Sequence, residues 1–149
     1  MEPVFDEPLA VGLEAGALAL GDLVLMVGKH EVLAAEVEVD TRTGKVRVLR
    51  AVTSVDAGKA INPRQCWLQN EGSMLTALGS ALQEEMVFDN GQPVNASFLD
   101  YLMPSMEDFP DDFQSRLVET PHPEGPYGAK GMGEAALGPV APAIGNAVA

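Results

Sequence analysis

The sequence predicts an α+β fold, in which a mixed sheet of short strands has helices packed on one side. Residues 33–56 alternate between apolar and polar side chains with a period of two, which is typical of strands. Residues 62–85 instead combine a helix-start signal with leucines at helical spacing. Since 149 residues are enough for one hydrophobic core, we expect these runs to belong to a single domain.

The first two strands are expected to form a β-hairpin. Residues 33–40 place Val37 and Val39 on one face and glutamates on the other. The alternation resumes in residues 45–56 after a turn that contains Gly44, which tolerates the positive φ angle of a tight turn. This pattern predicts a half-buried pair of strands.

A long helix is predicted to begin at Asn62 and Pro63, because asparagine is favoured as N-cap and proline at the first helical position. Few helix breakers follow before Glu85. Gly72 and Gly79 lie seven residues apart and therefore on roughly one face. Glycine costs about 1 kcal/mol relative to alanine inside a helix. The pair therefore predicts a close approach, by a packed element or, less commonly, by a ligand.

The second half of the chain is predicted to hold shorter elements. We expect a short strand and turn at residues 86–93, a polar loop at residues 109–112 and a further strand at residues 114–119. An irregular segment dense in proline and glycine is expected at residues 120–133. Residues 135–149 are mostly small and apolar, and we expect a final helix there, with Pro139 and Pro142 suited to its start. The buried face of that helix is assigned to Ala143, Ile144, Ala147 and Val148. The helix reaches the last residue without a terminator, so we expect truncation at the C-terminus.

Charge and composition narrow the classes of partner. The net charge of −13 argues against nucleic acid and against anionic membrane surfaces, both of which attract clustered Lys and Arg. Cys66 is the only cysteine, which is typical of a reducing compartment, so we expect a cytoplasmic protein. Residues 13–28 are apolar, but Glu14 and Asp22 interrupt them and they are shorter than a spanning helix. We therefore predict no membrane span.

The glycine-rich run at residues 125–134 is the most informative motif. Its glycines permit unusual backbone angles, Lys130 offers a cation, and Glu134 is its one carboxylate. Two interpretations of Glu134 follow from composition. A solvated loop glutamate is the commoner case, and a general base held by a tight loop is the sharper one.

Other chemistries fit less well. Residues 131–136 match a G-x-G-x-x-A dinucleotide fingerprint, but that motif needs a preceding apolar strand and an acidic residue about 20 positions later. Neither feature is present. His30, Cys66 and His122 lie far apart without the spacing of a zinc site.

Several short motifs occur in a fixed order along the chain. Together they resemble the C-terminal molybdopterin-binding region of the xanthine dehydrogenase and aldehyde oxidase family, the molybdenum hydroxylases. The segments that carry the resemblance are residues 36–44, 56–63, 69–72, 78–85, 100–104, 125–134 and 142–147. The resemblance implies that residues 33–149 form part of a larger molybdopterin-binding domain, and that residues 1–32 are a poorly matched segment.

The resemblance also implies an activity and a site. It implies hydroxylation of an aldehyde or N-heterocycle with water-derived oxygen, with Glu134 as general base. Cofactor-binding roles are implied for Gln69, Lys130, Gly131 and Gly133. No protein metal ligand is expected, because the family holds molybdenum through the pterin dithiolene. Two departures from the family pattern lie near Gln69, namely Leu68 and Ser73 where glycine is usual.

The implied cofactor is molybdopterin, with the cytosine dinucleotide form as an alternative. Iron–sulfur centres and FAD are expected on partner domains or subunits, together with an upstream molybdopterin-binding segment and a small-molecule substrate. The isolated chain is then incomplete and inactive. The competing hypothesis is a truncated, non-catalytic remnant or an assembly and interaction module.

Overall fold

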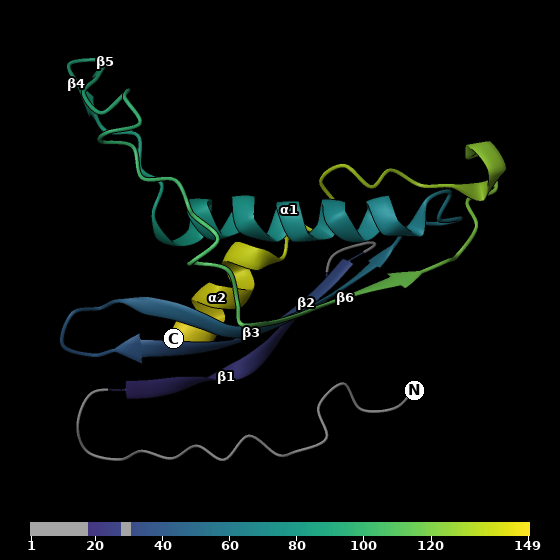
Figure 1. Ribbon diagram of the computed structural model, residues 1–149, viewed down its shortest axis with the longest axis horizontal. Helices are drawn as coiled ribbons and strands as arrows, with labels where there is room; N and C mark the ends of the chain where they lie inside the picture. The colour runs from purple at the N-terminus through teal and green to yellow at the C-terminus, as the bar shows by residue number, and fades with distance from the viewer. Residues whose placement is uncertain (1–17, 28–30) are drawn as a thin grey trace.

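The computed structural model describes the backbone of residues 18–27 and all atoms of residues 31–149 (Figure 1). The elements are, in chain order, β1 (Leu18–Val27), β2 (Glu31–Asp40), β3 (Val46–Asp56), α1 (Pro63–Leu82), β4 (Phe88–Asp89), β5 (Gln92–Pro93), β6 (Asp112–Val118), the 3₁₀ helix η1 (Pro126–Gly128) and α2 (Val140–Val148). The main sheet has the strand order β1-β2-β3-β6, and β4 and β5 form a separate two-stranded sheet. Its first three strands are antiparallel and β6 runs parallel to β3.

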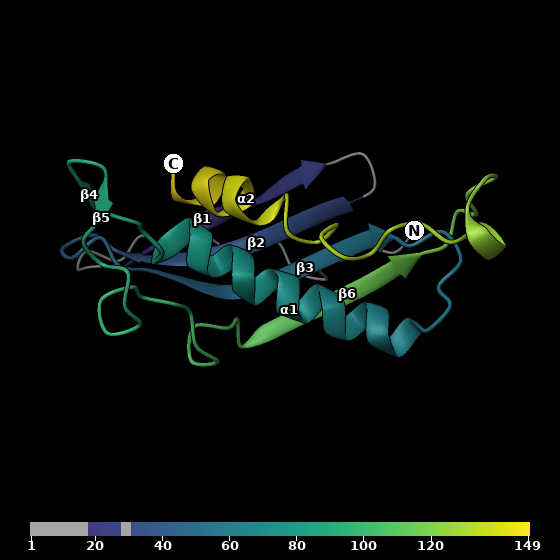
Figure 2. The same cartoon turned by 90° about the horizontal axis from the view of Figure 1, so that it is seen from above.

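Both helices lie on one side of the main sheet (Figures 1 and 2). The predicted α+β class, with a mixed sheet and helices packed on one side, is therefore confirmed. The core fills the space between these layers, and its buried members are Leu33, Ala35, Val37, Val48, Ala51, Met74, Ala77, Leu78, Val140, Ala143, Ile144 and Ala147. A partly buried hydrogen bond of 2.8 Å from Nδ2 of Asn70 to Oγ of Ser115 joins α1 to β6.

The predicted hairpin is confirmed as β2 and β3. Val37 and Val48 are register partners and are both buried, while Val39 packs against the edge of the core. Gly44 takes a φ angle of 75°, and its amide donates to the carbonyl of Asp40 at 2.7 Å. A bulge after the glutamate that precedes Val37 shifts the register.

Helix α1 begins as predicted. The Oδ1 atom of Asn62 accepts a hydrogen bond of 3.2 Å from the amide of Gln65, and Pro63 is the first helical residue. The helix ends at Leu82, short of the predicted end at Glu85. The amides of the two following residues both donate to the carbonyl of Gly79, which closes the last turn and stops the helix.

The two glycines of α1 have different surroundings. A Cβ atom on Gly79 would clash with Oε1 of Glu84 and would lie 2.6 Å from Cδ of Pro104. A Cβ atom on Gly72 would meet no heavy atom within 4 Å among the described residues. The predicted close approach is therefore confirmed at Gly79, where another segment packs, whereas no described segment packs against Gly72.

The remaining elements extend or correct the sequence predictions. The strand and turn at residues 86–93 are confirmed as β4 and β5, and the strand predicted at residues 114–119 is β6, which already includes Asp112. The final helix is confirmed as α2. Its prediction is wrong for Val148, the last residue of α2, which is 45% exposed and lies outside the buried set of that helix.

Strand β1 was not predicted, because its sequence lacks a clean period of two. It pairs with β2 and completes one edge of the sheet. The rest of the segment at residues 1–32 lies mostly outside the described residues. Among the described helices, none is both long enough and apolar enough to cross a membrane.

Alanine substitutions at the two α1 glycines separate helix propensity from packing. Gly72→Ala places a better helix former in open space, so the free energy of unfolding should rise by up to about 1 kcal/mol. Gly79→Ala forces Glu84 and Pro104 to move, so the same quantity should fall by about 1–3 kcal/mol. Urea unfolding followed by circular dichroism measures both. Equal destabilisation by the two substitutions would contradict the packing difference.

Candidate functional site

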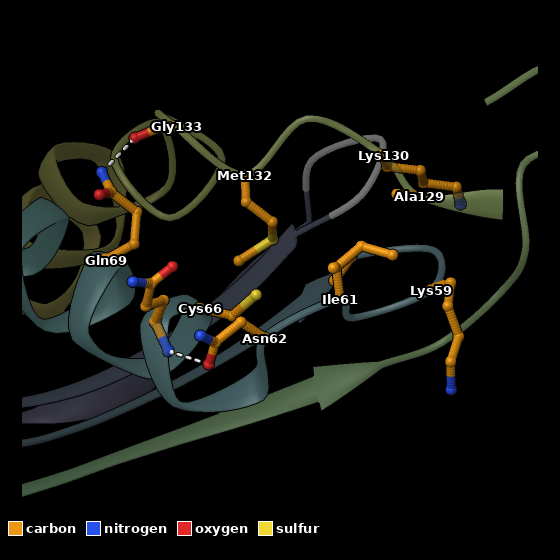
Figure 3. Close-up of a pocket in the computed structure, with 11 residues that line it drawn as sticks. Lys59, Ile61, Asn62, Cys66, Gln69, Ala129, Lys130, Met132 and Gly133 are labelled. Atoms are coloured by element: carbon orange, nitrogen blue, oxygen red, sulfur yellow. Dashed lines mark hydrogen bonds between the residues drawn. The ribbon is translucent and has the colours of Figure 1, made fainter. Parts of the chain in front are cut away.

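A cleft of about 370 Å³ lies between the first turns of α1 and the loop at residues 129–133 (Figure 3). Its lining residues are Ala57, Lys59, Ile61, Asn62, Gln65, Cys66, Gln69, Ala129, Lys130, Met132 and Gly133. The helix side is supplied by the start that Asn62 caps, and the loop side by the glycine-rich motif. Two segments that are distant in the sequence therefore form one concave surface.

Gln69 connects the two sides of this cleft. Its Nε2 atom donates a hydrogen bond of 2.5 Å to the carbonyl of Gly133, 64 residues later in the chain (Figure 3). The Gln69 side chain is exposed, so its amide oxygen faces a solvent-accessible space. The structure thus brings together two residues for which the family resemblance implies cofactor binding.

The turn after β3 holds the beginning of the loop in place. The amide of Lys130 donates to the carbonyl of Ala57 at 2.9 Å, and the amide of Lys59 donates to the carbonyl of Gly128 at 2.8 Å. Gly58 lies between these bonds with a φ angle of 62°, and a Cβ atom there would clash with the Gly128 carbonyl. Only glycine permits this approach.

A partly buried ion pair strengthens the same junction. The Nζ atom of Lys130 lies 2.7 Å from Oδ2 of Asp56, and the two side chains are 14% and 17% exposed. The other oxygen of Asp56 accepts hydrogen bonds from the amides of Gly58 and Thr120 at 2.9 and 3.1 Å. Burial alone would raise the pKa of Asp56, but Lys130 and these amides outweigh it and hold the pKa well below its usual value.

The second lysine that lines the cleft is also paired. The Nζ atom of Lys59 lies 3.0 Å from Oε1 of Glu119. The same oxygen accepts a 2.8 Å hydrogen bond from the amide of Ala60. That amide and Lys59 lower the pKa of Glu119. Both lysines in the lining therefore have carboxylate partners. The cleft is suited to a polar but largely uncharged group rather than to a strong anion.

The predicted site residues are only partly brought together. Gln69, Lys130 and Gly133 line the cleft, whereas Gly131 lines a neighbouring cleft of about 570 Å³ that also contains Lys130. Glu134 directly follows Gly133 in an exposed position and lines neither cleft. The Glu134 carbonyl accepts a 3.1 Å hydrogen bond from the amide of Leu137, in the segment that leads to α2.

Sequence reasoning overlooked the role of Asp56. Its Asp-Ala-Gly segment entered only as one of the ordered motifs, and Lys130 entered as a cation of the loop without a predicted partner. The two residues are 74 positions apart, so their pairing depends on the fold. A usable signal was the carboxylate at the very end of a strand followed by glycine.

The described residues offer no cluster of three or more His, Cys, Asp or Glu side chains that could hold a metal ion. The polar groups in the cleft are amides, backbone carbonyls and paired lysines. Such groups hydrogen-bond to the heteroatoms of an organic ring.

A model of the molybdopterin cofactor-binding domain matches residues 24–110, which is more than half of the chain. The chain belongs to the molybdopterin cofactor-binding domain family. The matched range includes Gln69 and Asp56 and ends before the glycine-rich loop. The resemblance stated from the motifs is thereby confirmed at the level of the family.

Individual relatives support the same family assignment. The chain is 38% identical over 149 residues to the 6-hydroxypseudooxynicotine dehydrogenase complex subunit gamma of Paenarthrobacter nicotinovorans, and the match covers 97% of this chain and 18% of that protein. It is 40% identical over 115 residues to the putative xanthine dehydrogenase molybdenum-binding subunit XdhA of Escherichia coli, covering 76% and 15%. The chain therefore spans less than a fifth of the length of these relatives.

Solved structures show the same fold. Quinoline 2-oxidoreductase from Pseudomonas putida matches with a TM-score of 0.74 and 39% identity, covering 79% of this chain and 15% of that chain. The aldehyde oxidoreductase of Desulfovibrio gigas matches with a TM-score of 0.71 and 32% identity, covering 79% and 13%. The sheet and helices described above are thus shared with molybdenum hydroxylase structures.

Replacing Asp56 by asparagine should lower the free energy of unfolding by roughly 1–3 kcal/mol at neutral pH, because Lys130 loses its partner in a partly buried site. The lowered pKa means that the pair stabilises the fold above the ordinary Asp pKa of about 3.9 and loses this contribution as the pH falls below it. The difference between wild type and Asp56→Asn should therefore be constant above about pH 5 and shrink in acid.

Urea unfolding of both proteins across this pH range tests the prediction. Asp111→Asn is the matched control, because Asp111 forms an exposed pair with Arg47 at 2.7 Å. An exposed pair contributes less than about 1 kcal/mol. A pH-independent difference for Asp56→Asn would show that the carboxylate charge is not what stabilises the junction.

Proposed function

We propose that this domain supplies one wall of the cofactor cleft and the general base of a molybdenum hydroxylase that acts on an aldehyde or an N-heterocycle. The observation that carries the proposal is the hydrogen bond between Gln69 and Gly133. This hydrogen bond joins the two segments to which we assign cofactor contacts. Glu134 is the next residue after Gly133 and is exposed beside the cleft. The use of water-derived oxygen is part of the same proposal.

The residues of the cleft fit a pterin in their chemistry. Gln69 offers an amide donor and acceptor, and Gly131 and Gly133 are exposed and bring backbone polar groups to the loop side. A Cβ atom at either glycine would meet no heavy atom within 4 Å among the described residues, so a ring can approach their backbone. We assign cofactor contacts to Gln69, Gly131 and Gly133. Lys130 supports the loop through Asp56 and contributes to the same cleft.

Glu134 is assigned the proton transfer. When bound, molybdopterin would supply a molybdenum centre that accepts the two electrons of the substrate C–H bond, which breaks as the new C–O bond forms. The carboxylate of Glu134 takes the proton from the oxygen nucleophile as that oxygen attacks the electron-poor carbon. The loop positions Glu134 from two sides, because Gly133 is bonded to Gln69 and the Glu134 carbonyl to the amide of Leu137.

The proposal extends to the rest of the enzyme. We expect the cofactor to be molybdopterin, with its cytosine dinucleotide form as an alternative, and we expect iron–sulfur and FAD subunits and an upstream molybdopterin-binding segment. Relatives described as a complex subunit gamma and as a molybdenum-binding subunit support a multi-subunit assembly. We expect this assembly to be cytoplasmic, in keeping with the unpaired Cys66.

A second candidate is a non-catalytic remnant or an assembly module. It is favoured by one observation, namely that the chain spans only 15–18% of two relatives. Under either candidate the isolated chain is inactive. Metal analysis of the assembled protein separates them, because about one molybdenum per chain would reject the remnant.

Glu134→Gln should lower kcat of the assembled, molybdenum-containing enzyme by about 10²–10⁴-fold, because the amide cannot accept the proton. The molybdenum content should be unchanged. Glu124→Gln is the control, since Glu124 is an exposed glutamate in the same region of the chain and should retain full activity. Turnover by Glu134→Gln at the wild-type rate would reject the assignment of the base.

Gln69→Ala should weaken cofactor retention by about 3–10-fold, the effect of losing one hydrogen bond of about 1 kcal/mol. Molybdenum and pterin content after dialysis measures this. Gln114→Ala, in an exposed position of β6, should retain the cofactor like the wild type. Equal retention by both variants would remove Gln69 from the site.

A further inference from the structure

An apolar arm projects from the domain at the end of α1. Residues 84–106 leave the helix after Leu82, form the β4–β5 hairpin and return toward β6, away from the sheet (Figures 1 and 2). Its most exposed apolar side chains are Phe88, Val94, Phe98, Leu99, Leu102 and Met106. Phe98 and Leu99 are 85% and 90% exposed. Such a concentration of exposed apolar side chains marks a surface that a partner covers.

The arm is internally ordered. The side chain of Asn95 accepts from the amide of Val87 at 2.9 Å and donates to the carbonyl of Glu85 at 2.6 Å, which braces the hairpin. At the base of the arm, the hydroxyl of Tyr101 donates to Oε2 of Glu84 at 2.8 Å. A preorganised surface loses little conformational freedom when a partner binds.

The turn that presents the two most exposed residues is also closed. The hydroxyl of Ser97 accepts from the amide of Leu99 at 3.2 Å. The Ser97 carbonyl accepts from the amides of Asp100 and Tyr101 at 3.0 and 2.8 Å. Phe98 and Leu99 are thus held outward by backbone geometry rather than exposed by chance.

The charge of the arm restricts its partner. The sequence has no Lys or Arg between Arg64 and Arg116, while the arm carries Glu85, Asp89 and Asp100. An apolar groove rimmed by Lys and Arg is the complementary surface. A second copy of this chain is disfavoured, because it brings the same acidic arm and a net charge of −13.

We propose that the arm is the docking surface for the remainder of a molybdopterin-binding subunit, whose groove is apolar and edged with basic residues. The inference rests on the proposed function, and it adds the surface through which the domain is joined. Two relatives hold more than four fifths of their length outside the stretch that this chain matches. That remainder is the body of protein available to cover Phe98 and Leu99.

The test measures binding of the 149-residue chain to a defined partner. That partner is the part of the 6-hydroxypseudooxynicotine dehydrogenase complex subunit gamma outside the aligned stretch, immobilised through a tag. The wild-type chain should bind it, and added salt should weaken the binding. Leu99→Ser and Phe98→Ser should each weaken it about tenfold or more. Val118→Ser is the matched control, because Val118 is 46% exposed at the far end of β6 and should bind like the wild type.

Circular dichroism and thermal unfolding establish that the partner is folded before it is immobilised and that the variants keep the wild-type fold. The proposal is overturned if the wild-type chain does not bind, or if Leu99→Ser and Phe98→Ser bind as tightly as Val118→Ser. It is also overturned if light scattering finds that the chain alone dimerises and that Leu99→Ser dissociates the dimer. Molybdenum analysis of the complex, formed in a host that makes the cofactor, separates the two proposals. Arm-dependent assembly without molybdenum contradicts only the proposed function, and arm-independent assembly with molybdenum contradicts only this inference.

Discussion

The ion pair between Asp56 and Lys130 connects the sheet to the loop that carries the candidate site. Asp56 is the last residue of β3, so its position is set by the hydrogen bonds of the strand. Lys130 lies in a segment that has no regular secondary structure of its own. By accepting from Lys130 and from the amides of Gly58 and Thr120, one carboxylate holds three separate backbone segments. The shape of the cleft depends on this junction.

The mixed sheet explains why these segments meet. Because β6 runs parallel to β3, the two strands end at the same edge, and the chain leaves β6 beside the turn that follows Asp56. The amide of Ala57 donates to the carbonyl of Val118, which closes this edge. The loop at residues 120–133 therefore starts next to the turn it packs against. Carboxyl ends of parallel strands are a common location for ligand clefts.

Helix α1 connects the cleft to the apolar arm. Its first turns line the cleft, and its last turn supports the base of the arm through Gly79 and Glu84. Twenty helical residues separate these ends by roughly 30 Å. The proposed cofactor contacts and the proposed docking surface therefore lie at opposite ends of one helix.

The sequence by itself determined the α+β class, the hairpin, the start of α1, the family and the candidate residues Gln69 and Gly133. These features depend on local periodicity, capping and short motifs, which can be recognised without the fold. Only the tertiary structure decided that Lys130 is paired with Asp56, that Gly79 and not Gly72 is packed against another segment, and that Glu134 lies outside the cleft lining. Each of these depends on which distant residues become neighbours, and β1 likewise forms because β2 offers it a free edge. Long-range pairing of this kind leaves no periodic signal in the chain.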